Sequence, residues 1–184
     1  ARLCVCGHAE RERCGERDDA RVRYMQAHGF PFATHGRTEI EAPHAFYDYD
    51  NAEFAKLAIR QLLQKGRRKI ALLAPPNSLL YHKHTLAGFL EGLGQAGLSA
   101  NVLDVDIDSN MNDIKAYGEK LGASDNAPDG IVVSGAMAAI ALISGLETAG
   151  KKIGHDFDIV SKQSTMPLNW YRSEIMAINE DFHE

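Results

Sequence analysis

Residues 50–73, DNAEFAKLAIRQLLQKGRRKIALL, decide the fold class of this chain. Asp50 is a favourable N-cap residue, and Glu53 three positions later completes a capping box. Gly66 ends the helix, and the apolar run from Ile70 to Ala74 is typical of a strand buried on both faces of a parallel sheet. One face of the helix is apolar and consists of Phe54, Ala55, Ala58, Ile59, Leu62 and Leu63. The stretch therefore predicts a crossover helix that leads into a parallel strand.

The same pattern of helix and strand recurs along the chain. Ahead of residue 50, the segments ARLCVC, DDARVRYMQAHG and PFATHG predict a strand, a helix and a strand. After residue 73 we expect helices at about 77–96, 110–121 and 136–149, and strands at 101–107, 130–134 and 158–161. Asn77 or Ser78 is expected to cap the first of these helices. The alternation predicts an α/β fold with parallel sheets.

The composition is that of a globular protein, with 184 residues of which 45% are hydrophobic and 24% are charged. A net charge of −5 argues against a nucleic-acid-binding surface on this segment. The first residues lack a charged region followed by an apolar one, so we expect no signal peptide, and no run approaches the ~20 apolar residues of a membrane span. Three cysteines without disulfide-scaffold spacing favour a reducing compartment, so we expect a cytoplasmic protein with no membrane contact. Because the chain starts inside a predicted strand and without Met, we also expect a fragment.

The carboxyl ends of the predicted strands are polar. In open parallel sheets, small ligands bind beyond these ends. Here they carry glycine-punctuated polar segments at His8 and at residues 35–37, 77–84, 106–110, 134–135 and 161–164. We therefore expect a polar small-molecule ligand. Tyr81, His82 and His84 either contact this ligand or lie exposed on the first helical turn.

Other motifs allow a structural interpretation beside a functional one. The run CVCGHAERERC lacks the later P-C-x-x-C pair of a zinc deaminase, so no metal site is expected. Tyr47 and Tyr49 either stack on a ligand or form a strand that crosses between subdomains with alternate faces buried. Arg37 either binds the ligand or pairs with Glu39 or Glu41.

Motifs of enzymes are missing from the sequence. It contains no G-x-G-x-x-G, no G-x-x-x-x-G-K-[ST] and no G-x-S-x-G, so we expect no enzyme, no catalytic residue and no cofactor. The basic run GRRK at 66–69 is explained by the dipole of the preceding helix and not by nucleic-acid binding.

Five segments in succession resemble the lactose-repressor (LacI/GalR) family of bacterial transcription regulators. They are GFPFATHGRT, YDYDN, KGRRKIALLAPP, HTLAGFLEGLGQAG and DGIVVSGAMAAIALISGLETAGKKIGHDFDIVSKQST. Their order and spacing match over nearly the whole chain, from about Asp19 to Glu184. The resemblance implies a periplasmic-binding-protein-like type I fold, in which two parallel-sheet three-layer α/β subdomains are joined by crossovers and a small molecule binds between them.

The resemblance also implies a division of the chain. Residues 1–45 would be part of an incomplete N-terminal subdomain, residues 46–165 the C-terminal subdomain, and residues 166–184 a truncated crossover back, with INEDFHE starting a helix. It further implies a homodimer that binds operator DNA through a helix-turn-helix ahead of Ala1. The alternative is a periplasmic solute-binding protein of an ABC transporter, which would carry a signal peptide and need no dimer surface.

Candidate ligand contacts follow from the resemblance, although this chain departs from the family pattern. Thr85 stands where the family often has Arg, Gly135 where it often has Asp, and residues 161–164 replace a Gly-aromatic-Asp-Asp turn. We therefore expect neutral groups to hold an effector that is a sugar or another small metabolite. The candidate ligand-binding residues are Tyr81, His84, Thr85, Asn110, Ser134, Gln163, His35 and Arg37.

Overall fold

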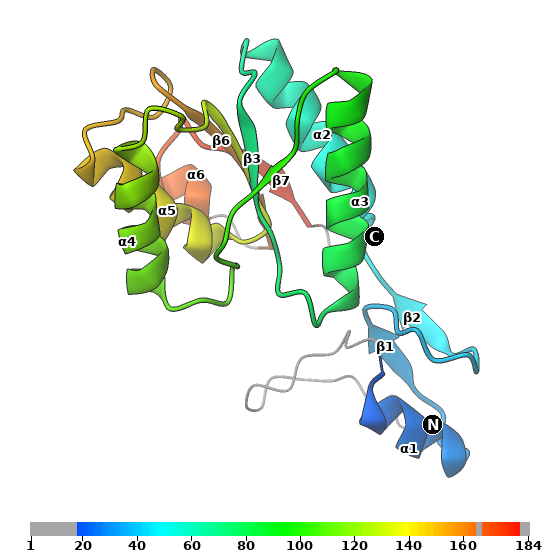
Figure 1. The fold of residues 1–184 in the computed structure, drawn as a ribbon. Helices are drawn as coiled ribbons and strands as arrows, with labels where there is room; N and C mark the ends of the chain where they lie inside the picture. Colours follow the sequence, from blue (N-terminus) through cyan, green and yellow to red (C-terminus); the bar gives the residue numbers. More distant parts are fainter. Residues whose placement is uncertain (1–17, 165–166, 181–184) are drawn as a thin grey trace.

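The computed structural model describes residues 18–164 and 167–180 (Figure 1). Its main feature is a five-stranded parallel sheet. The strands lie in the order β4-β3-β5-β6-β7, and each neighbouring pair is parallel. Their bounds are β3 Ile70–Leu73, β4 Asn101–Val102, β5 Gly130–Val133, β6 Asp158–Gln163 and β7 Met176–Asn179. The predicted α/β fold with parallel sheets is confirmed. The predicted strand ARLCVC and the cysteine-rich run lie outside the described residues.

Helices cover both faces of this sheet, and two apolar cores result. Figure 1 shows α2 and α3 on one side of the sheet and α4, α5 and α6 on the other. Alternate residues of each strand face opposite sides, so Leu72 and Val160 pack against α2 and α3, whereas Ile131 and Ile159 pack against α4, α5 and α6. The bounds are α2 Asn51–Gln64, α3 Leu80–Gln95, α4 Met111–Gly122, α5 Ala136–Thr148 and α6 Pro167–Tyr171.

A smaller unit precedes the main sheet and consists of α1 Ala20–Ala27, β1 Ala33–His35 and β2 Ala45–Tyr47. Strands β1 and β2 pair in parallel, and Figure 1 shows the unit beyond the carboxyl ends of the main strands. All three residues of β2 are exposed, including Phe46 and Tyr47. The prediction that this segment has alternate faces buried is therefore wrong, because within the described residues no second layer covers β2.

The start of α3 corrects a prediction. Leu79 occupies the N-cap position, and no side chain caps the helix, so neither Asn77 nor Ser78 has the expected role. Leu79 and Leu80 are both buried, and the Leu79 N–H donates to the Pro76 carbonyl. The turn that begins at Pro76 and the burial of Leu79 and Leu80 thus determine where the helix starts.

Two strands also differ from the predicted ranges. The strand expected at 101–107 is regular only over β4, although Leu103 N–H still donates to the Leu72 carbonyl and Ile107 N–H to the Ala74 carbonyl. The start of INEDFHE forms the end of β7 and not a helix, because residues 178–179 pair with the end of β6. The five-stranded sheet thus extends to the end of β7, and the proposed subdomain boundaries stay a prediction.

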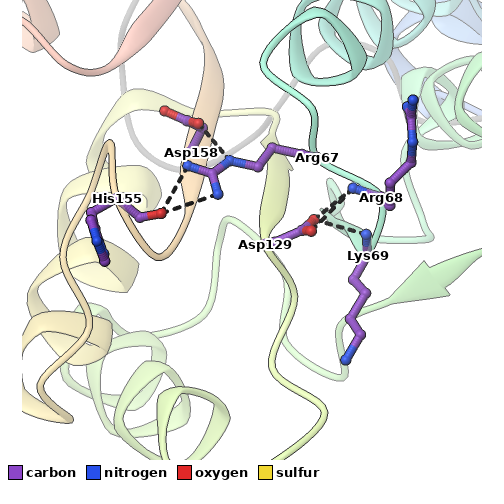
Figure 2. Close-up of polar contacts among 6 residues, drawn as sticks. All are labelled: Arg67, Arg68, Lys69, Asp129, His155 and Asp158. Carbon is purple, nitrogen blue, oxygen red and sulfur yellow. Dashed lines mark hydrogen bonds and ion pairs between the residues drawn. The ribbon is translucent and has the colours of Figure 1, made fainter.

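The basic run 66–69 contacts residues at the amino ends of β5 and β6 (Figure 2). Arg67 Nε lies 2.7 Å from Asp158 Oδ2, and the Arg67 guanidinium also donates to the His155 carbonyl at 3.1 and 3.2 Å. The backbone N–H groups of Arg68 and Lys69 donate to the carboxylate of Asp129. The run therefore links β3 to β5 and β6, and Arg67 has an ion pair that the helix-dipole explanation did not include.

Candidate ligand-binding site

Ser134 follows β5 directly, at the carboxyl end of the main sheet. Its N–H donates to the Leu73 carbonyl at 3.2 Å, which fixes the backbone against β3. The residue is 4% exposed, and within the described chain its Oγ has no hydrogen-bond partner. A buried hydroxyl that lacks a partner is energetically costly and rare in native proteins. Ser134 is thus chemically suited to bond an additional polar group at the carboxyl end of the five-stranded sheet, which we call the ligand edge.

Three candidate residues lie on the first turns of α3. Thr85 is completely buried, and its Oγ1 donates to the Tyr81 carbonyl at 2.8 Å, so its hydroxyl is used within the helix. Tyr81 and His84 are half-buried. The neighbouring His82 places Nδ1 2.6 Å from the Pro75 carbonyl, which ties the first turn of α3 to the end of β3.

Gln163 lies at the end of β6 and holds neighbouring elements together. It is 2% exposed, its Nε2 donates to Asn179 Oδ1 at 2.8 Å, and its Oε1 accepts from Leu168 N–H at 3.3 Å. The side chain therefore connects β6 to β7 and α6. Each end of the amide is used once, but Nε2 has a second N–H and Oε1 a second lone pair, so a direct contact of Gln163 with a ligand stays a prediction.

Asn110 and Arg37 have local partners. Asn110 is exposed and caps α4, where its Oδ1 accepts from Asn112 N–H at 2.8 Å. Arg37 Nε lies 3.3 Å from Asp48 Oδ2, and its guanidinium carbon lies 5.3 Å from the centre of the Phe46 ring. The ion pair of Arg37 is thus with Asp48, a partner that the sequence analysis did not name.

His35 lies in the smaller unit and approaches the main sheet through Tyr49. The His35 ring stacks on Tyr47 at 6.3 Å and meets the edge of Tyr49 at 6.1 Å. The Tyr49 ring in turn lies 6.0 Å from Lys162 Nζ, and the Tyr81 ring lies 5.3 Å from the same atom. His35, Tyr49, Lys162 and Tyr81 therefore form a continuous series of contacts between the two units.

Sequence reasoning placed Lys162 in the polar segment 161–164 but did not select it as a candidate residue, and it missed Asn51 and Glu180. Lys162 Nζ donates to Asn51 Oδ1 at 2.8 Å and lies 2.7 Å from Glu180 Oε1. The available signal was the lysine at the place where the resemblance implies an aromatic residue. Nothing local in the sequence indicates its partners, because Asn51 precedes it by 111 residues.

Two further properties of the described residues concern metal sites and membrane spans. Among residues 18–164 and 167–180, no group of three or more His, Cys, Asp or Glu side chains has an arrangement that could hold a metal ion. In the same residues, none of the helices has the length and apolar character that crossing a membrane requires.

The fold defines a class: an α/β domain in which a smaller unit lies beyond the carboxyl ends of a parallel five-stranded sheet. Residues 59–175 match the model of the periplasmic binding protein-like domain, and the chain belongs to this family. The resemblance to the effector domain of LacI-type regulators is confirmed by the relatives and by the structures of similar fold.

Among the relatives is the HTH-type transcriptional regulator AglR of Rhizobium meliloti. It is 27% identical over 155 residues, which cover 82% of this chain and 43% of AglR. A LacI-family regulatory protein from Chloroflexus aggregans has the same fold, with a TM-score of 0.76, 23% identity, and coverage of 88% of this chain and 59% of that one. The CelR–cellobiose complex aligns with a TM-score of 0.74 and 22% identity, over 90% and 51% of the two chains. The chain spans about half the length of the curated relatives that it matches.

Proposed function

We propose that this chain is the effector-binding region of a LacI-type transcriptional regulator and that its effector is a neutral sugar or a related polyhydroxyl metabolite. The observation that carries the proposal lies at the carboxyl ends of the parallel strands: among the described residues the Ser134 hydroxyl has no hydrogen-bond partner, and the half-buried Tyr81 ring lies at the same ends. Hydroxyl and aromatic groups are suited to a ligand rich in hydroxyls and C–H faces. The solved CelR complex, which contains cellobiose, supports this class of ligand.

The proposed mechanism is a shift between open and closed arrangements of the two units. A ligand that contacts both units binds the closed arrangement more tightly, and this difference in affinity shifts the population. The contacts between units in the present structure include an exposed ion pair, with Lys83 Nζ 2.9 Å from Glu39 Oε1, and the contacts of Tyr49 with Lys162. A ligand that replaces such contacts with its own would change the arrangement.

We further propose that the whole protein acts as a homodimer in the cytoplasm and binds operator DNA through a helix-turn-helix outside this chain. The regulators among its relatives support the DNA-binding role. Trp170 and Tyr171 on α6 are 86% and 41% exposed, and large exposed aromatic side chains favour a protein partner. A periplasmic solute-binding role is less well supported, because the curated relatives named here are regulators.

The test is a ligand screen on the native protein, expressed at full length from its own coding sequence. Thermal unfolding is measured with ribose, glucose, galactose, cellobiose and raffinose, and binding to genomic DNA fragments is then measured with each sugar that raises the melting temperature. We expect at least one sugar to stabilise the protein and to change its affinity for DNA. A protein that binds DNA fragments with no sugar response would refute the effector class, and a protein that binds no DNA would refute the regulator.

A further inference from the structure

Lys162 is a largely buried cation with two polar partners from distant segments. Its side chain is 12% exposed and that of Glu180 is 13% exposed, with 2.7 Å between Lys162 Nζ and Glu180 Oε1. The second partner is the Asn51 amide oxygen at 2.8 Å, on a residue that is itself 3% exposed. Two charges removed from water to this extent are tolerated only when their mutual geometry is good and further hydrogen bonds support them.

Three aromatic rings surround the same ammonium group. Nζ of Lys162 lies 5.3 Å from the centre of the Tyr81 ring, 5.8 Å from that of Phe54 and 6.0 Å from that of Tyr49. These distances are within the range of cation–π attraction. The rings therefore restrict the position of the cation, and the cation restricts the rings in return.

Two of the chain segments that contact Lys162 border the five-stranded unit at its ligand edge. Tyr49 and Asn51 lie where the chain passes from β2 into α2. Glu180 lies directly after β7, and its N–H donates to the Gln163 carbonyl at 2.8 Å. Residues in such terminal and connecting positions absorb the changes in backbone angle when two units reorient. Lys162 thus fastens both segments to the end of β6.

We propose that Lys162 is a positioning residue: it clamps the two bordering segments to β6 and holds the Tyr49 and Tyr81 rings at the ligand edge. The clamp is a property of the ligand-free protein. Its consequence, that it sets the arrangement from which an effector closes the two units, rests on the proposed function. Loss of the clamp then allows both segments, the second of which includes the edge strand β7, to open locally while the central strands β3 and β5 stay paired.

Hydrogen–deuterium exchange of the full-length native protein, without ligand, tests the clamp. In Lys162→Met, which keeps the length and apolar stem of the side chain, we expect exchange to become about tenfold faster in peptides that cover 49–54 and 176–180, as the loss of a charge-assisted hydrogen bond implies. Peptides that cover β3 and β5 should be unchanged. Lys162→Arg should restore slow exchange, because a guanidinium can pair with Glu180 and stack on the rings. Lys69→Met, at an exposed lysine on the opposite end of the sheet, is the control.

The outcomes separate a clamp from a general contribution to the core. Equal acceleration in all peptides, or no acceleration in either bordering segment, would overturn the proposal, as would a failure of Arg to rescue. If Lys162→Met does not yield folded protein, Glu180→Gln removes the ion pair and keeps the shape, and the same two segments should exchange faster. Local acceleration in a protein that responds to none of the screened sugars would retain the clamp and count against the proposed function alone.

Discussion

Substitution of Ser134 by Ala should raise the stability of the free protein and weaken its ligand binding. The Ser134 hydroxyl is buried, and within the described chain it has no partner. An unpaired buried hydroxyl costs about 1–3 kcal/mol. Alanine removes this cost and leaves a void of about one oxygen atom, which offsets part of the gain. We therefore expect Ser134→Ala to increase the free energy of unfolding of the ligand-free protein by up to about 1 kcal/mol.

The ligand-bound state should respond in the opposite direction. If an effector hydroxyl bonds Ser134 Oγ, its loss removes one neutral hydrogen bond, which contributes about 0.5–1.5 kcal/mol. The dissociation constant should then rise by roughly 2- to 12-fold. A gain in free stability together with a loss in affinity is a signature that damage to the fold cannot produce.

Urea unfolding followed by circular dichroism gives the stability, and isothermal titration calorimetry gives the affinity for the sugar that the screen identifies. Ser99→Ala is the matched control, because Ser99 is exposed and precedes β4 at the other end of the sheet. Lower stability of free Ser134→Ala would show that the hydroxyl is already satisfied, for example by water. An unchanged affinity would show that the effector does not reach it. Either result would refute the reasoning.

Three further predictions concern stability. Arg67→Met should lower the free energy of unfolding by about 3 kcal/mol, measured by urea unfolding, because its buried carboxylate partner, 4% exposed, loses its counter-charge. Gly145→Ala should lower the free energy of unfolding by about 1–3 kcal/mol, because the added Cβ would lie 2.1 Å from the Lys115 carbonyl oxygen. Gly94→Ala is the control: its Cβ would meet open space, so the substitution should leave the stability unchanged or raise it. Asp19 is the N-cap of α1, and the side-chain hydrogen bond from Arg21 is the main cause that lowers its pKa. The stabilisation of α1 by this carboxylate is therefore present above pH 3.8 and is lost as the pH falls through the lowered pKa. An NMR titration of α1 amides checks this, and Asp19→Asn should abolish the pH dependence; a retained dependence would assign it to another group.

Local patterns in the sequence were sufficient for the fold class and for most elements from α2 to β6, whereas α6 and β7 were not predicted. The apolar spacing of α2, its cap at Asp50 and the continuously apolar β3 and β5 lie where they were predicted, because helix periodicity and burial on both faces of a parallel strand leave local signatures. The same information correctly indicated that polar residues collect at the carboxyl ends of the strands. The short edge strand β4 was overestimated, since an exposed edge lacks the second neighbour that extends regular pairing.

The partners of the polar side chains were decided only by the tertiary structure. Arg67 and Asp158 are 91 residues apart, and Lys162 and Asn51 are 111 apart, so no local pattern connects them. The same holds for Ser134: the sequence indicated its place at the end of β5, but its lack of a partner depends on what every neighbouring element brings to that position. Backbone conformation follows largely from residues close in sequence, whereas the satisfaction of a buried charge or hydroxyl depends on groups that only folding brings together.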